Sequence, residues 1–276
     1  MLGAIIGDTI GSVFEFHNTK DYDFTLFSSE SNFTDDSIMS MAIAQWLIID
    51  LNHSYKTLEE MMVKFAKEYP CPKGGYGGGF HHWLFNSPGG RRPYRSWGNG
   101  SAMRCSAVGW FFETLSETER VAKISAEITH NHPEGIKGAQ ATSAAIWMAR
   151  NGKDKFEIKD YIQRTYGYNL ERSWKELHET YNWDSSCQGT VPEAIICFIE
   201  STDFEDAIRK AVSIGGDSDT LACITGGIAE AFYQIIPEDM ILKTIKQLPD
   251  TFLGIIQNMG NNTFYKNCFP KYVICK

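Results

Sequence analysis

Residues 211–237 read AVSIGGDSDTLACITGGIAEAFYQIIP, in which an acidic cluster is followed directly by a long apolar run. The run from Leu221 to Ile236 has the length of a helix, is apolar nearly all round and stops at Pro237. Because it contains Glu230 and is shorter than a bilayer requires, a transmembrane span is excluded. The stretch therefore predicts a buried helix with carboxylates at its start.

Other stretches also predict helices. Residues 38–49 are almost continuously apolar, and residues 139–150 are rich in alanine, which favours two more buried helices. Capping boxes of the form Thr/Ser-x-x-Glu predict further helix starts at Thr57, Ser116 and Thr202. Few runs alternate with period two, and strands do not alternate with helices. The sequence predicts an all-α protein.

Composition and charge narrow the class of protein. The 276 residues are 43% hydrophobic and 22% charged, which is typical of a globular chain, and we expect one domain over residues 1–276. A net charge of -8 argues against attraction to nucleic acid or an anionic membrane. Seven cysteines without a CxxC pair fit a reducing compartment. The apolar start lacks basic residues, so we expect no secretory signal and a soluble, cytoplasmic, monomeric protein.

Two glycine-rich patterns stand out. Gly3, Gly7 and Gly11 recur at every fourth residue and line one face of a helix, so we expect another backbone to approach that face closely. This spacing is not the GxGxxG fingerprint of dinucleotide-binding proteins. Between Pro70 and Gly100, glycine, proline and aromatic residues crowd together, which predicts an extended, ordered loop with a function.

Two acidic clusters are the sharpest chemical signal. Residues 33–37 read FTDDS and residues 215–220 read GGDSDT, and each directly precedes a predicted buried helix. Capping of the helix N-terminus is the ordinary explanation, but a cap uses one side chain, whereas each cluster carries two carboxylates and a threonine hydroxyl. Buried carboxylates without a cation are costly, and oxygen donors suit Mg²⁺, Mn²⁺ or Ca²⁺ better than zinc. We infer a metal site with one or two ions.

Two other motifs fit the second cluster less well. An EF-hand loop starting at Asp217 needs a ligand at Leu221 and a glycine at Ala222, so it is excluded. The sequence DSDT also resembles the nucleophile loop of haloacid-dehalogenase-type phosphatases, in which the first aspartate is phosphorylated. That loop usually follows a strand near the start of an α/β domain, whereas this one occurs late in a helical chain. A phosphatase using Asp217 remains the alternative.

Three smaller features have both a structural and a functional interpretation. Residues 97–104, WGNGSAMR, offer free backbone N–H groups for a phosphate or diphosphate, or else form a simple Asn-Gly turn. His130 and His132 precede a proline, and exposed histidines at a helix end explain them without zinc. Glu15 stands between two phenylalanines, which would raise its pKa and suit acid/base work, unless its side chain points to solvent.

Together these segments resemble the ADP-ribosylglycohydrolase family, which includes dinitrogenase reductase-activating glycohydrolase and the ADP-ribose-acceptor hydrolases. The resemblance covers most of residues 3–237 and is weak in residues 153–183 and after residue 237. The matching motifs follow one another in order: GAIIGDTIGSVFEF, FTDDS, YPCPKGGYGGGF, PYRSWGNGSAMR, THNHPEGIKGA, VPEAI and AVSIGGDSDTLACITGGIAEAFYQIIP.

The resemblance implies an all-α orthogonal helical fold with two Mg²⁺ or Mn²⁺ ions at the base of a cleft. The metal ligands that it implies are Thr34, Asp35, Asp36, Asp217, Asp219 and Thr220. Glu15 is implied beside the scissile bond, with Asp35 and Asp36 as further catalytic residues. The implied substrate-binding residues are Asn99, Gly100, Ser101, Met103, His130, Gly216 and Ser218.

The reaction implied is hydrolysis of the glycosidic bond at the anomeric carbon of ADP-ribose, with free ADP-ribose as a product. The acceptor is not visible in the sequence: a modified protein side chain comes first, and a small molecule or a modified nucleic-acid end stays open. Besides the phosphatase, a non-catalytic ADP-ribose-binding protein remains an alternative.

Overall fold

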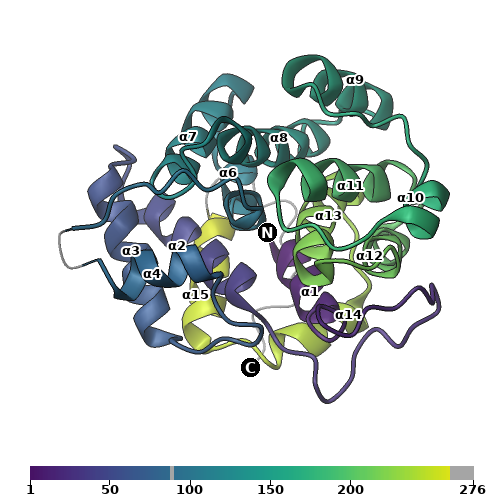
Figure 1. The fold of residues 1–276 in the computed structure, drawn as a ribbon, viewed down its shortest axis with the longest axis horizontal. Helices are drawn as coiled ribbons and strands as arrows, with labels where there is room; N and C mark the ends of the chain where they lie inside the picture. Colours follow the sequence, from purple (N-terminus) through teal and green to yellow (C-terminus); the bar gives the residue numbers. More distant parts are fainter. Residues whose placement is uncertain (88–89, 262–276) are drawn as a thin grey trace.

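The computed structural model describes residues 1–87 and 90–261, and these residues form fifteen helices joined by loops (Figure 1). In this part of the chain the only β-type pairing is two isolated bridges, Thr34 with Lys73 and Gly98 with Ser186. The predicted all-α class is confirmed. That the chain is one domain stays a prediction.

The helices follow one another closely. The first eight are α1 (Leu2–Gly11), α2 (Asp35–Ile49), α3 (Tyr55–Glu68), α4 (Gly78–Phe85), α5 (Gly100–Met103), α6 (Ser106–Phe111), α7 (Leu115–Glu127) and α8 (Pro133–Arg150). The remaining seven are α9 (Lys155–Tyr166), α10 (Trp174–Thr180), α11 (Cys187–Ile199), α12 (Phe204–Ser213), α13 (Ser218–Tyr233), α14 (Glu238–Ile245) and α15 (Asp250–Asn261).

Helices α1 and α13 pack against each other near the middle of the molecule (Figure 1). A Cβ added to Gly3 would lie 2.4 Å from the carbonyl oxygen of Gly226, and one added to Gly7 would lie 2.0 Å from that of Ala222. The predicted close approach at the glycine face is confirmed. Because contacts nearer the end of α1 meet residues nearer the start of α13, the helices are antiparallel. The chain leaving α1 therefore passes the first turn of α13.

The buried helices form as predicted, but their ends differ. Helices α2, α8 and α13 begin before the predicted apolar starts, because the acidic residues and Pro133 form part of their first turns. Helix α13 ends at Tyr233, where Gln234 takes a left-handed conformation with φ of 56°. Ile235 is 75% exposed, so the last predicted residues lie outside the helix. Pro237 caps the start of α14.

The three predicted capping boxes are wrong in position. The side chains that accept the capping hydrogen bonds are Ser54 for α3, Thr114 for α7 and Asp203 for α12, in place of Thr57, Ser116 and Thr202. In α3 and α7 an earlier hydroxyl caps the free N–H groups, so Thr57 and Ser116 lie inside the helix. In α12 the carboxylate of the next residue, Asp203, is the cap, so Thr202 lies outside the helix. Complete capping boxes occur instead at Asp154 with Glu157 and at Ser173 with Glu176, which the sequence analysis missed.

The predicted loop between Pro70 and Gly100 is interrupted by α4, so that prediction is wrong over residues 78–85. The helix forms because Phe80, Trp83 and Leu84 all reach the core. The rest of the described segment is loop, as predicted, and residues 88–89 lie outside the described residues. In the described part of the chain no helix has both the length and the apolar character needed to cross a membrane. The five cysteines described there are free.

Candidate active site

A cleft of about 370 Å³ opens where the starts of α2, α5 and α13 converge with the segment after α1 and the glycine-rich loop before α4. Five carboxylates face it: Glu15, Asp35, Asp36, Asp217 and Asp219. Other predicted site residues in its lining are Asn99, Gly100, Met103, His130 and Thr220. The structure thus gathers most of the predicted site residues around one cavity.

Capping does not account for the acidic clusters. At α2 the cap is Thr34, whose hydroxyl accepts the N–H of Asp36 at 3.2 Å, so the carboxylates of Asp35 and Asp36 are not needed for it. At α13 Asp217 occupies the cap position, but its side chain makes no capping hydrogen bond. The buried Oδ2 of Asp36 has no hydrogen-bond partner. A carboxylate oxygen without a hydrogen-bond partner at the wall of a cleft is available as a ligand for a cation.

A sixth carboxylate, Asp8 on α1, supports the α2 cluster from behind. It is fully buried and accepts hydrogen bonds from the N–H and the hydroxyl of Thr34, at 3.0 and 2.7 Å, and from the N–H and hydroxyl of Ser37. Burial raises the pKa of Asp8 to about 6. Since the Thr34 hydroxyl hydrogen is donated to Asp8, its oxygen keeps one lone pair after capping. The sequence analysis missed Asp8, although an aspartate inside an otherwise apolar, small-faced helix is a visible signal.

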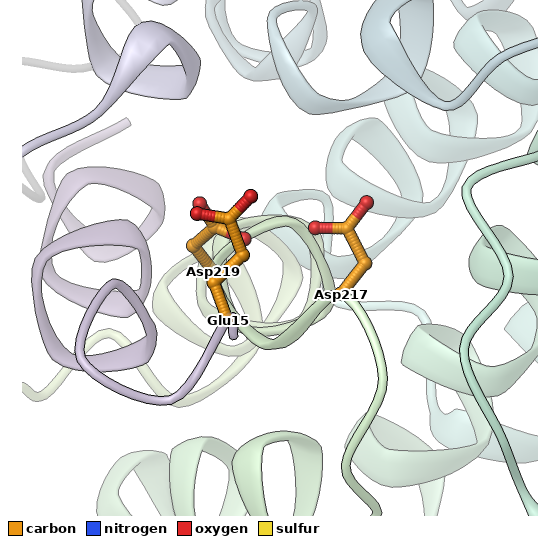
Figure 2. Close-up of side chains that lie close together, drawn as sticks. All are labelled: Glu15, Asp217 and Asp219. Carbon is orange, nitrogen blue, oxygen red and sulfur yellow. The ribbon is translucent and has the colours of Figure 1, made fainter. Parts of the chain in front are cut away.

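Glu15, Asp217 and Asp219 form the tightest group of carboxylates, with one oxygen of each within 4.8 Å of the others (Figure 2). Burial, followed by the negative charges of Asp217 and Asp8, raises the pKa of Glu15 to about 7. Of the two possibilities that the sequence left open, the Glu15 side chain lines the cleft and does not point to open solvent. Phe16 is 66% exposed, so the walls of the cleft, and not the Phe16 ring, bury the carboxylate.

The two clusters are electrostatically joined. The hydroxyl of Thr220 donates to Oδ1 of Asp36 at 3.4 Å, linking the start of α13 to that of α2. Burial and the surrounding negative charges raise the pKa values of Asp35, Asp36 and Asp219 well above the usual range. The carboxylates that line this partly buried cleft repel one another, and a divalent cation would relieve that repulsion. The donors are all oxygens, so the site fits a hard divalent metal ion.

The start of α5 contributes a second kind of group. The side-chain nitrogen of Asn99 donates to Oδ2 of Asp217 at 2.8 Å and to the hydroxyl of Thr190 at 3.1 Å, so Asn99 orients a carboxylate of the cluster. A Cβ added to Gly100 would lie 3.3 Å from Nε2 of His130, so glycine leaves the imidazole room beside the backbone.

His130 lines the cleft, where the family resemblance implies a substrate-binding histidine. The ordinary explanation, an exposed histidine at a helix end, does not apply to it, because it is buried and its Nδ1 lies 2.7 Å from the hydroxyl of Thr129. Burial and the nearby Arg104 guanidinium hold the pKa of His130 well below its usual range, so the imidazole is neutral. His132 caps α8 by accepting the N–H of Glu134 at 3.2 Å.

Four predicted site residues lie behind the lining of the cleft: Thr34, Ser101, Gly216 and Ser218. Ser101 donates its hydroxyl to the carbonyl of Gly135 at 2.7 Å, and Ser218 donates to that of Gly216 at 3.2 Å. A role in substrate binding stays a prediction for Ser101, Gly216 and Ser218, and metal binding stays a prediction for Thr34.

The mouth of the cleft holds aromatic residues that the sequence analysis did not select. Phe16 and Trp183 are both exposed and stack with ring centroids 5.9 Å apart and planes at 19°. Phe16 directly follows Glu15, and Trp183 comes from the loop before α11. An exposed aromatic pair beside a carboxylate offers a flat apolar face at the entrance.

Comparisons with known proteins agree with this arrangement. A model of the ADP-ribosylglycohydrolase family matches residues 1–262. Human ADP-ribosylhydrolase ARH3 is 25% identical over 320 residues, covering 86% of each chain. ADP-ribosylarginine hydrolase Tri1 of Pseudomonas putida is 24% identical over 260 residues, covering 85% of this chain and 70% of Tri1. A solved ADP-ribosylglycohydrolase-related protein complex shares the fold, with a TM-score of 0.73 and 19% identity over 97% of both chains.

The cleft is rich in carboxylates and lies in an all-α fold, which does not fit a phosphatase with an α/β domain. The chain belongs to the ADP-ribosylglycohydrolase family. The phosphatase alternative needs a strand before Asp217, but α12 occupies residues 204–213 there.

Proposed function

We propose that this protein is a metal-dependent hydrolase that cleaves the glycosidic bond between ADP-ribose and a modified acceptor. The observation that carries the proposal is the group of Glu15, Asp217 and Asp219, whose carboxylate oxygens lie within 4.8 Å of one another at the cleft. Membership of the family and the names of the relatives support the reaction class.

Two divalent ions, Mg²⁺ or Mn²⁺, are the proposed cofactors. Their ligands would come from Thr34, Asp35, Asp36, Asp217, Asp219 and Thr220. The orphaned oxygen of Asp36 and the free lone pair of Thr34 support this set. When bound, such ions hold hydroxyl groups of a sugar and polarise a water molecule.

The proton of the reaction is assigned to Glu15. A water oxygen bonds to the anomeric carbon of ADP-ribose while the glycosidic bond breaks. The electron pair of the broken bond leaves with the acceptor atom. The Glu15 carboxylate takes a proton from that water and returns one to the acceptor, so the products are ADP-ribose and the unmodified acceptor. The position of the Glu15 carboxyl group in the cleft wall, beside Asp217 and Asp219, supports this assignment.

The remaining lining residues are proposed to hold the ADP-ribose. Asn99, Gly100 and Met103 line the cleft wall, and because Gly100 has no side chain, a diphosphate can approach the backbone there. His130, being neutral, offers Nε2 for a hydrogen bond without adding charge. The stacked Phe16 and Trp183 rings border the side from which the acceptor enters.

A modified protein side chain is the proposed acceptor, with a small molecule second. Nucleic acid is proposed only as a modified acceptor, because the net charge of -8 repels its backbone. A cytoplasmic monomer with one domain is proposed on composition alone.

The test is release of ADP-ribose from a panel of substrates modified on arginine, on serine or on a nucleic-acid end. Release from at least one of them is expected, and the substrate with the highest rate of release identifies the acceptor. Tight binding of ADP-ribose without release from any member of the panel would make the protein a non-catalytic ADP-ribose-binding protein.

A further inference from the structure

The segment that carries Glu15 has no regular secondary structure to hold it. Helix α1 ends at Gly11 and α2 begins at Asp35, and Glu15 lies in a series of turns and bends between them. Asp217, by contrast, stands at the start of a long buried helix. The distance between the two carboxylates must therefore be set by contacts made by the loop itself.

The exposed side chain of Asn18 makes four of those contacts. Its nitrogen donates to the carbonyl oxygens of Phe14 at 2.6 Å and of Glu15 at 2.9 Å, and to that of Gly216 at 2.8 Å. Its oxygen accepts the N–H of Gly216 at 2.7 Å. Only an amide oxygen accepts an N–H and only an amide nitrogen donates to carbonyls, so the four contacts fix the orientation of the amide.

These hydrogen bonds join two distant parts of the chain. Gly216 has φ of 80°, a conformation that favours glycine, and it directly precedes Asp217. One side chain thus ties the backbone of Glu15 to the backbone that leads into Asp217. Lys20 strengthens the same junction, since its Nζ donates to the carbonyl of Ile214 at 2.5 Å.

We propose that Asn18 is a positioning residue that sets the placement of Glu15 relative to Asp217 for hydrolysis. The inference rests on the proposed function. Asn18 does not line the cleft, so it acts through Glu15 and Asp217 without touching the substrate. If Asn18 had a purely structural role, its substitution would change the stability of the protein but would not lower kcat selectively over KM.

Asn18→Ala removes all four hydrogen bonds. Asn18→Asp keeps an acceptor for Gly216 but removes every donor and sets a negative charge against three carbonyl oxygens. Asn151→Ala is the matched control, because Asn151 is also exposed and also donates to a backbone carbonyl, that of Trp147 at 2.7 Å, far along the chain from the cleft. All variants are assayed on the substrate that the wild type cleaves fastest.

Both Asn18 variants are expected to lower kcat about 10-fold or more while KM changes by less than about 3-fold, since a misplacement of about 1 Å costs on the order of 100-fold in rate. Asn151→Ala keeps the wild-type kcat. Hydrogen exchange at the Gly216 amide, which needs no activity, is expected to be faster in Asn18→Ala.

The outcomes separate the two proposals. If the wild type turns over but Asn18→Ala keeps its kcat, or if Gly216 exchanges at the wild-type rate in Asn18→Ala, the assignment of Asn18 is overturned. If kcat falls in Asn18→Ala and Asn151→Ala alike and follows the loss of thermal stability, Asn18 is structural only. A wild type that releases no ADP-ribose from any acceptor contradicts the proposed function itself.

Discussion

The backbone of Gly74 lies directly against the carboxylate of Glu15: a Cβ added to Gly74 would stand 2.5 Å from Oε2 of Glu15. Gly74 has φ of 76°, in the left-handed region. The glycine-rich loop is therefore part of the wall that buries Glu15. Its glycine leaves the space that the carboxylate occupies.

We expect Gly74→Ala to displace Glu15 and to lower kcat about 10-fold or more, because of the clash as well as the backbone strain. Gly152→Ala is the matched control, since Gly152 has φ of 77° and nothing within 4 Å of the added Cβ. The two variants share the strain of about 1–2 kcal/mol, so thermal melting should shift similarly. Equal kcat values in the two variants would show that the contact with Glu15 has no consequence.

Glu15→Gln should keep ADP-ribose binding and slow turnover, because it removes a proton-transfer group and little volume. Transfer by one positioned group is worth about 10²–10⁴-fold in rate. Turnover and ADP-ribose titration are measured side by side, with Glu179→Gln on the exposed surface of α10 as the control. Wild-type turnover across the whole pH range would make Glu15 structural.

Asp36→Asn and Asp219→Asn should each lose metal affinity and keep the fold. Neither carboxylate is the helix cap, and asparagine is in any case tolerated at a helix start. Calorimetric titration with Mn²⁺ gives the affinity, and circular dichroism gives the helix content. Unchanged Mn²⁺ affinity in both variants would mean that the clusters are not ligands.

The metal-free protein should become less stable relative to Glu15→Gln as pH rises from about 4.5 to about 7. In that window the folded wild type binds a proton on Glu15 that the unfolded chain has released, so deprotonation favours unfolding. The difference is on the order of 1 kcal/mol, read from urea unfolding in EDTA at several pH values. The prediction is contradicted if the free energy of unfolding of the wild type rises with pH relative to that of Glu15→Gln.

The fold class and the core helices were predictable because Gly3, Gly7 and the run after Leu221 carry periodic, apolar patterns. The helix ends were less predictable, since Ser54 and Thr57 are both residues that can cap a helix, and the structure has Ser54 as the cap of α3. Helix α4 was not predicted because the glycines before Phe80 obscure the apolar pattern of the helix in the sequence.

The acidic half of the site was predictable, because Asp36 and Asp219 exceed what capping needs. The supporting groups were not. In the sequence, Asp8 is a single polar residue in a core helix. No local sequence pattern around Trp183 or Asn18 predicts a cleft. Their roles come from contacts between segments far apart in sequence, which no short motif encodes.

The most direct test is the rate of ADP-ribose release after exhaustive treatment with EDTA and after return of Mg²⁺ or Mn²⁺, for the wild type and for Asp219→Asn. The account predicts that chelation abolishes release, that either ion restores it in the wild type, and that the variant regains far less. Full release by the wild type after complete chelation would contradict it.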